Sequence, residues 1–242
     1  MTVAIKSLQK QPLLNPPGRR EWNFSDELEK DKGIILNTLR AQKTASQVLY
    51  FAPILFALHE MNVAVDVTED DKRVMAEQVE RSRKRSFRLN AAKLNLILKK
   101  LGGEVSGADD MATINQSINE DAWKRFPDKV AETVYLRSFF GGGAPTETEQ
   151  KRMMAALEST QGEDRSRLLY ILKEAGVIHE VEDKEVYAIK KMIDEKRIQI
   201  TADPKPNNVM QLANLHLHLN KIAERKPQND EETPVLPPLK KI

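Results

Sequence analysis

The segment from Lys72 to Lys100 constrains the fold of this chain more than any other part of the sequence. It contains ten basic residues and only two acidic ones, Glu77 and Glu80, and its apolar residues recur with the period of an α-helix. The window carries a net charge of +8 whereas the whole chain carries +2, so the remaining residues sum to −6. This pattern predicts one basic helix over 72–100 in a protein whose charge is unevenly distributed.

On a helix that turns by about 100° per residue, five basic side chains of this segment share one side. These residues are Arg81, Lys84, Arg85, Arg88 and Lys99. Apolar residues, among them Phe87, Leu94 and Leu101, fall on the opposite side and are expected to face a core. Arg83 interrupts that apolar side, so we expect it to meet a carboxylate or to reach water.

A row of cations on one helix can neutralise phosphates without reading bases, which predicts non-specific contact with nucleic acid through these five residues. Two other interpretations remain open. The row is either solvated or paired with acids of the same protein, such as Asp66, Glu69, Asp70 and Asp71. Binding to a membrane surface is the other alternative, although Leu89 and Leu96 are the only large apolar residues beside the row.

The composition narrows the classes of chemistry. The chain has no cysteine, which removes disulfides, thiolate metal sites and cysteine nucleophiles. Aromatic residues make up 5% of the chain, which argues against a large platform for stacking bases. The most apolar run, from 48 to 58, contains Pro53 and is about half the length that a membrane span needs. We therefore expect a soluble protein, in the cytoplasm or in a virion.

Proline-rich segments mark both ends of the chain. Residues 1–24 and 227–242 contain seven of the 12 prolines, and neither segment has enough apolar residues to fold alone. We predict an extended arm at each end, with a mainly α-helical body in two lobes, 25–110 and 111–226, between them. Arms that cannot fold alone are useful when each completes a neighbouring subunit, which predicts a homo-oligomer or a larger assembly.

Local signals place most of the helices. Thr68 with Asp71, and Thr146 with Glu149, have the spacing of capping boxes, and glycines mark several helix ends. The run from Leu96 to Gly102 resembles that from Tyr170 to Gly176, which we interpret as two similarly built helices rather than a repeat.

One segment, 197–201, alternates in polarity like a short strand and is the only β element expected. The three predicted helices before it, with this strand as a wing, also allow a winged-helix DNA-binding regulator or a replication accessory protein.

The remaining motifs indicate structural roles rather than metal binding, phosphate binding or catalysis. His216 and His218 alternate with leucines, but on a helix their side chains diverge, and no metal site is predicted. Gly141, Gly142 and Gly143 precede a helix start but lack the Lys-Ser/Thr ending of a phosphate-binding loop, so we interpret them as a hinge or a tight connection. Adjacent acids occur in predicted loops and tails, and no nucleophile and base can be paired.

These observations predict no catalytic residue and no cofactor. The function that fits them is that of a non-enzymatic structural or assembly protein, such as a virion connector or a nucleocapsid-type subunit. It would be a homo-oligomer, or join other subunits through its arms, and contact nucleic acid through the basic helix. Membranes are not expected among its partners.

Overall fold

The computed structural model describes residues 24–43, 47–85, 87–103 and 108–223. These residues form eleven α-helices and no strand, so the mainly α-helical prediction is confirmed. The helices are α1 (Phe24–Gln42), α2 (Val48–Glu60), α3 (Glu69–Lys84), α4 (Arg88–Lys100), α5 (Ala108–Ser117), α6 (Glu120–Arg125), α7 (Pro127–Phe139), α8 (Glu147–Ser159), α9 (Gly162–Glu174), α10 (Asp183–Ala202) and α11 (Pro206–Ala223). The two predicted arms fall almost entirely outside these residues.

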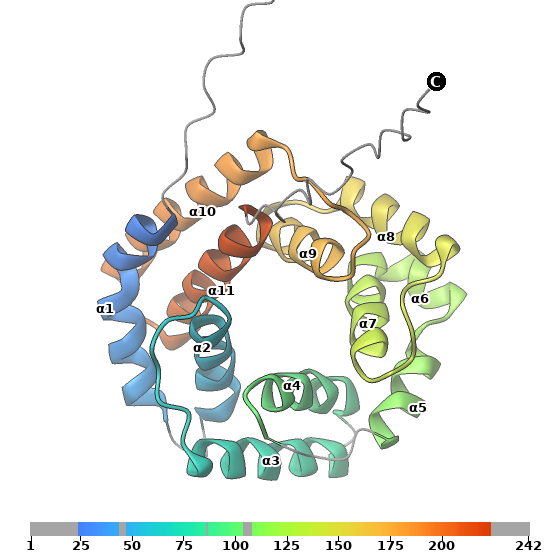
Figure 1. Cartoon of the computed structure of the whole chain (residues 1–242), viewed down its shortest axis with the longest axis horizontal. Helices are drawn as coiled ribbons and strands as arrows, with labels where there is room; N and C mark the ends of the chain where they lie inside the picture. The colour runs from blue at the N-terminus through green and yellow to red at the C-terminus, as the bar shows by residue number, and fades with distance from the viewer. Residues whose placement is uncertain (1–23, 44–46, 86, 104–107, 224–242) are drawn as a thin grey trace, which may run out of the picture.

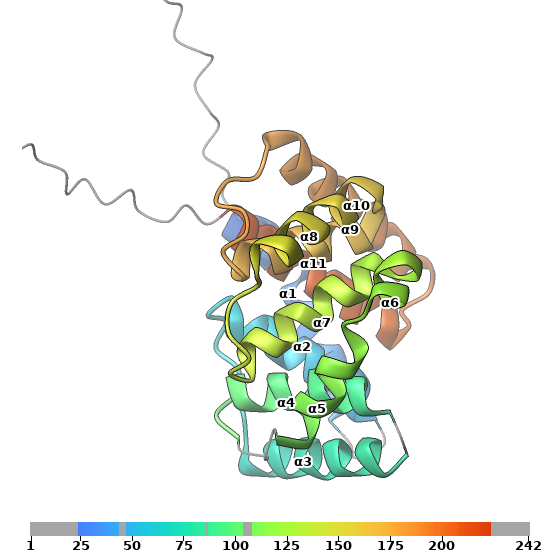
Figure 2. The same ribbon diagram turned by 90° about the vertical axis from the view of Figure 1, so that its right-hand side faces the viewer.

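The helices form two concentric layers around one centre (Figure 1). Five inner helices, α2, α4, α7, α9 and α11, contact one another in that order, and α11 returns to contact α2. The other helices pack outside them, with α3 at one edge of the molecule and α10 at the opposite edge (Figure 2). The chain therefore closes into a ring of helical hairpins.

Contacts between the inner helices show that neighbours run in the same direction. Lys93 of α4 pairs with Glu132 of α7 at 2.8 Å, and Lys100 at the end of α4 lies 3.9 Å from Glu60 at the end of α2. Four of the inner helices, α2, α4, α7 and α9, are each 13 residues long. Equal lengths in register bring their carboxyl ends to the same side of the ring.

The same four helices end in the same way. In each, the second residue after the helix has a positive φ, and the following N–H bonds back to a carbonyl in the last turn at 2.9 Å, which is a Schellman cap. The positive-φ residues are Asn62, Gly102, Gly141 and Gly176. Three of the four are glycine because this backbone conformation crowds a Cβ atom.

The polarity of each helix explains its layer. Outer helix α3 buries one stripe, in which Met75 and Val79 lie one turn apart, and exposes the opposite side. Inner helices are apolar on most sides because they pack against both outer and inner neighbours. The leucine–histidine alternation around Leu217 is of this kind, since α11 packs against α1, α2, α9 and α10.

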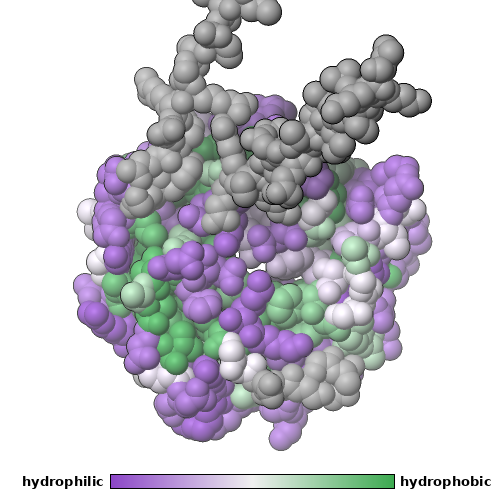
Figure 3. All heavy atoms as spheres, in the orientation of Figure 1, coloured by the Kyte–Doolittle hydropathy of each residue, from purple (hydrophilic) through white to green (hydrophobic). Residues whose placement is uncertain are grey.

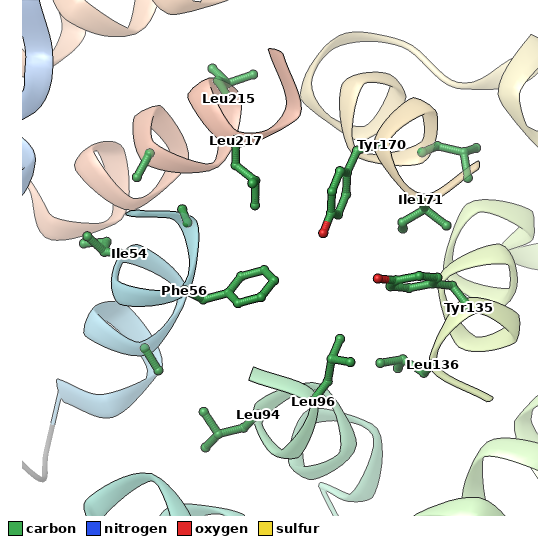
Figure 4. Packing of buried hydrophobic residues seen from close by; sticks show 14 of the residues in the cluster. Ile54, Phe56, Leu94, Leu96, Tyr135, Leu136, Tyr170, Ile171, Leu215 and Leu217 are labelled. Atoms are coloured by element: carbon green, nitrogen blue, oxygen red, sulfur yellow. The ribbon is translucent and has the colours of Figure 1, made fainter. Parts of the chain in front are cut away.

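One side chain from each inner helix points into the middle of the ring (Figure 4). In the four 13-residue helices it is the ninth residue. The five residues are Phe56, Leu96, Tyr135, Tyr170 and Leu217, all buried. The side chains of Tyr135 and Tyr170 form a hydrogen bond, and burial raises the pKa of Tyr135 to about 12. The centre is thus filled by side chains of the core.

The resemblance between 96–102 and 170–176 follows from this arrangement. Leu96 and Tyr170 occupy the same position in α4 and α9, and Gly102 and Gly176 cap those helices in the same way. The interpretation of two similarly built helices is confirmed. Their likeness reflects equivalent places in the ring.

The predicted helix over 72–100 is wrong in one respect, because the chain turns between Lys84 and Arg88. The N–H of Phe87 bonds to the carbonyl of Ser82 at 2.9 Å, the same closing bond that ends the inner helices. α3 then stays in the outer layer, while α4 enters the inner one and packs against it.

The strand predicted over 197–201 is also wrong, because this segment is the last part of α10. Its alternation is local, whereas the buried residues of α10, including Ile189, Ile193 and Ile200, recur with a helical period. Arg197 fixes the segment to α1 through bonds of 2.9 Å to the Asp31 carboxylate. The wing of the winged-helix alternative is therefore absent.

The predicted lobe boundary after residue 110 falls inside α5. Helices from the two expected lobes also pack together, since α2 contacts α11 and α4 contacts α7.

On the face shown in Figure 3, hydrophilic residues lie over the centre of the ring, and apolar surface shows over α1 and α2. In the loop after α2, half-buried Val63, Val65 and Val67 pack against the core.

Candidate nucleic-acid interface

The turn between α3 and α4 brings four of the five predicted basic residues to one corner of the molecule. Arg81, Lys84 and Arg85 lie at the end of α3, and Arg88 is the first residue of α4. All four side chains are exposed. We call these four residues the basic corner.

The basic corner is not neutralised by the rest of the described chain. Among the described residues no carboxylate lies within 4.0 Å of these four side chains, and Arg81 reaches only Gln78, at 3.4 Å. Three of the four acids proposed as partners begin α3 and bind other cations, whereas Asp66 precedes the helix and accepts from Lys43 through its backbone carbonyl. Glu69 binds Lys72, Asp70 binds Arg73 and Asp71 binds Lys43. Four positive charges therefore face solvent together.

Lys99 does not belong to this corner. It lies eleven residues after Arg88 on α4, which corresponds to about 16 Å along the helix axis. Its ammonium group lies 5.4 Å from the centroid of the Phe140 ring and 6.0 Å from that of Phe139. Both residues belong to α4, so the distance along this helix, and not the turn after Lys84, separates Lys99 from the other four residues.

Arg83 fixes the corner from inside. Its side chain is 12% exposed and donates to both carboxylate oxygens of buried Asp110, at 3.0 and 2.6 Å. Asn95 of α4 donates to the same carboxylate at 2.8 Å. This hydrogen bonding to Asp110 raises the pKa of Arg83. The expected carboxylate partner of Arg83 is confirmed, and it ties α3, α4 and α5 together.

Phe87 lies in the basic corner and was expected in the core. It immediately precedes α4, and its side chain is 59% exposed. The assignment to the apolar side assumed a continuous helix, so the turn overturns it. A shallow hollow of about 560 Å³ lies beside Phe87, lined by the first turn of α4 and by Thr113, Gln116 and Ser117 of α5.

The three glycines follow the end of α7; two of them have positive φ values, and the third, Gly142, packs closely against the last turn of the helix. Gly141 and Gly143 have φ values of 90° and 79°. A Cβ atom on Gly142 would lie 2.4 Å from Cγ of Arg137. These positions are those of a tight connection, and motion at a hinge here stays a prediction.

His216 and His218 lie on α11 and are both buried, each with its own partner. His216 Nε2 lies 2.7 Å from the Asp31 carboxylate, and His218 Nδ1 lies 3.1 Å from the Ser166 hydroxyl. The described residues contain no group of three His, Cys, Asp or Glu side chains placed to hold a metal ion. The two histidines face different neighbours.

The Ser166–His218 contact resembles a nucleophile and its base but is enclosed. Ser166 is 1% exposed, and its hydroxyl donates to the Glu163 carbonyl at 2.8 Å. Burial lowers the pKa of His218 to about 3, and the ring stacks on Tyr170 with centroids 5.2 Å apart. This geometry joins α9 to α11, with the Ser166 hydroxyl bonded to both His218 and the Glu163 carbonyl.

Compared with protein-family models, curated proteins and solved structures, this chain matches none. Among the described helices, none combines the length and the apolar character needed to cross a membrane. The basic corner is therefore interpreted from its own geometry and charge.

Proposed function

We propose that this protein is a non-enzymatic assembly subunit that binds the phosphate backbone of nucleic acid through the basic corner. The observation that carries the proposal is the exposure of Arg81, Lys84, Arg85 and Arg88 together, without a carboxylate partner among the described residues. Cations placed in this way neutralise phosphates and release counterions, which favours binding irrespective of base sequence.

The position of the corner supports this function. It lies at a turn between two helices at the edge of the ring, where an extended polymer can approach (Figure 1). The Arg83–Asp110 pair holds the end of α3, where three of the cations lie, against α5. The surface holds four cations rather than five, because Lys99 is separated from them.

Charge reversal tests the corner. Replacing all four residues by glutamate should weaken binding of a fluorescent 20-nucleotide DNA by at least about tenfold at 0.1 M salt, measured by anisotropy. The salt dependence of binding should flatten, because up to four phosphate contacts are lost. Two oligonucleotides of different sequence should bind alike.

A matched control reverses four exposed lysines that already pair with carboxylates of the chain, namely Lys151, Lys184, Lys191 and Lys205. It changes the net charge equally and should weaken binding much less. Lys99→Glu alone should also have a small effect. Equal loss in the control and in the corner variant would refute a localised site.

The assembly half of the proposal is supported by the sequence of the arms, residues 1–24 and 227–242. Each arm would pack on a neighbouring subunit and so form a homo-oligomer. Light scattering should give a mass above that of the 27.5 kDa chain for the full-length protein and a smaller mass after removal of residues 1–24 and 227–242. Monomers in both cases at micromolar concentration would refute this half.

A further inference from the structure

An exposed aromatic ring lies within the basic corner. Phe87 is flanked in sequence by Arg85 and Arg88, and 59% of its surface is open to solvent. Its backbone is held on both sides, since its N–H bonds to the Ser82 carbonyl and its own carbonyl accepts from Ala91 at 3.0 Å. The ring is therefore displayed from a fixed point.

The surface beside the ring is hollowed. Phe87 shares the hollow of about 560 Å³ with Leu89 and Asn90 of α4 and with Gln116 of α5, so its lining is partly apolar and partly polar. Arg88 also lines this hollow and brings a positive charge to it. A flat, partly apolar group with a phosphate attached matches this combination of surfaces.

We propose that the basic corner prefers single-stranded nucleic acid, with an unpaired base stacked on Phe87 and the adjoining phosphates bound by the four cations. This inference rests on the proposed function and adds that the nucleic acid is single-stranded. Stacking on an aromatic ring contributes about 1–3 kcal/mol per base and tolerates every base, because each has a π face.

Duplex nucleic acid does not offer this contact. Its bases are stacked on one another, so only the phosphates reach the cations and Phe87 adds nothing. An acidic peptide would satisfy the cations but leave the ring without a planar partner. The low aromatic content of the chain is compatible with the proposal, which needs one ring and no extended platform.

The test compares two probes on the full-length protein, fluorescent oligo(dT) of 20 nucleotides and a duplex of 20 base pairs. Phe87→Ala should weaken oligo(dT) binding by at least about fivefold, the lower limit of base–aromatic stacking, and should leave duplex binding unchanged. Phe87→Trp should restore it. Tyr187→Ala removes a ring that is 65% exposed on α10, at the opposite edge of the molecule, and should change neither probe (Figure 2).

The outcomes separate the two proposals. If Phe87→Ala binds oligo(dT) as tightly as the unaltered protein, or weakens both probes equally, the stacking inference is wrong while phosphate binding stands. If the unaltered protein binds neither probe but binds polyglutamate, both proposals are wrong. Unchanged helicity by circular dichroism is expected for Phe87→Ala, because the side chain is mostly in solvent.

Discussion

Lys93 and Glu132 pair at 2.8 Å, and each is the sixth residue of its 13-residue helix. This contact places the middles of α4 and α7 side by side, so the two helices lie at the same height. Tyr135 and Tyr170, the ninth residues of α7 and α9, repeat that relation in the next pair of helices. The register of the ring thus comes from helices of equal length that end in equivalent caps.

Loss of the Asp110 carboxylate should destabilise the protein strongly. Asp110→Asn removes the buried carboxylate of the Arg83 pair, although Arg83 keeps its contact with the half-exposed Glu80 at 2.6 Å; removal of one partner of a buried pair typically costs about 3–5 kcal/mol. We expect a fall of about 3 kcal/mol in the free energy of unfolding in urea. Glu120→Gln, at an exposed pair with Arg152, should change it by less than about 1 kcal/mol.

A second variant separates charge from packing at this site. Combining Arg83→Met with Asp110→Leu removes both charges together, so the double variant should recover part of the stability lost in Asp110→Asn. A double variant less stable than the single one would show that side-chain shape, not the unpaired charge, dominates.

Glu149 should make stability depend on acid pH. Its hydrogen bonds with Arg137 at 2.7 Å and with Thr146 lower its pKa from 4.5 to about 2. Its contribution is therefore complete above about pH 4.5 and is lost as the pH falls towards 2. Glu149→Gln should lower the free energy of unfolding by about 2 kcal/mol at pH 7. Below pH 4.5 the difference in this free energy between the variant and the unaltered protein should shrink.

The matched control for Glu149 is Glu147, in the same helical turn. Its side chain is 81% exposed and pairs with Lys151 four residues later. Glu147→Gln should be nearly neutral in urea unfolding at every pH. A constant difference between Glu149→Gln and the unaltered protein from pH 7 to pH 3 would contradict the assigned pKa.

His218 should act in a different pH range. Its folded pKa of about 3 lies below its ordinary value of 6.5, so between these values the unfolded chain binds a proton that the folded chain excludes. Stability should therefore fall as the pH drops below about 6.5, by up to about 1.4 kcal/mol per pH unit. Between pH 6.5 and pH 5, the free energy of unfolding of His218→Gln should fall by about 2 kcal/mol less than that of the unaltered protein, as measured by urea titrations.

His59 is the comparison for this effect, because it is exposed near the end of α2. His59→Gln should retain the full loss of stability between pH 6.5 and pH 5. If His218→Gln shows the same loss, the proton uptake belongs to another group.

Features set by neighbouring residues were predictable from the sequence. The capping boxes at Thr68 and Thr146 are present because a hydroxyl and a carboxylate three residues apart complete them locally. Arg83 was recognisable as the one cation on an apolar side. The helical reading of His216 and His218 is confirmed for a similar reason, since leucines before and after them continue a helical period.

Features set by distant residues were not predictable. No glycine or proline marks the turn after Lys84, and α4 leaves the line of α3 because the inner layer accepts a helix that is apolar on most sides. Closure of the ring depends on contacts such as that of Lys221 with Glu60, which adjacent residues do not specify. The exposure of Phe87 is a consequence of the same turn.

Replacement of glycine by alanine should have opposite effects on stability at two positions, one inside a helix and one at a helix cap. Gly33 lies inside α1, where an added Cβ meets nothing within 4 Å, so Gly33→Ala should stabilise the protein by about 0.5–1 kcal/mol. Gly176 also has open space around it, but its φ is 70°, so Gly176→Ala should destabilise by about 1–2 kcal/mol.

Asn62 provides the reverse test of the same caps. It holds a φ of 56° at the end of α2, where the other three inner helices of this length have glycine. Asn62→Gly should therefore be neutral or stabilising, whereas Asn62→Ala should destabilise by about 1 kcal/mol, both measured by thermal and urea unfolding. If alanine is tolerated at both Asn62 and Gly176, the shared Schellman caps do not contribute to the stability of the ring, and the register must come from side-chain packing alone.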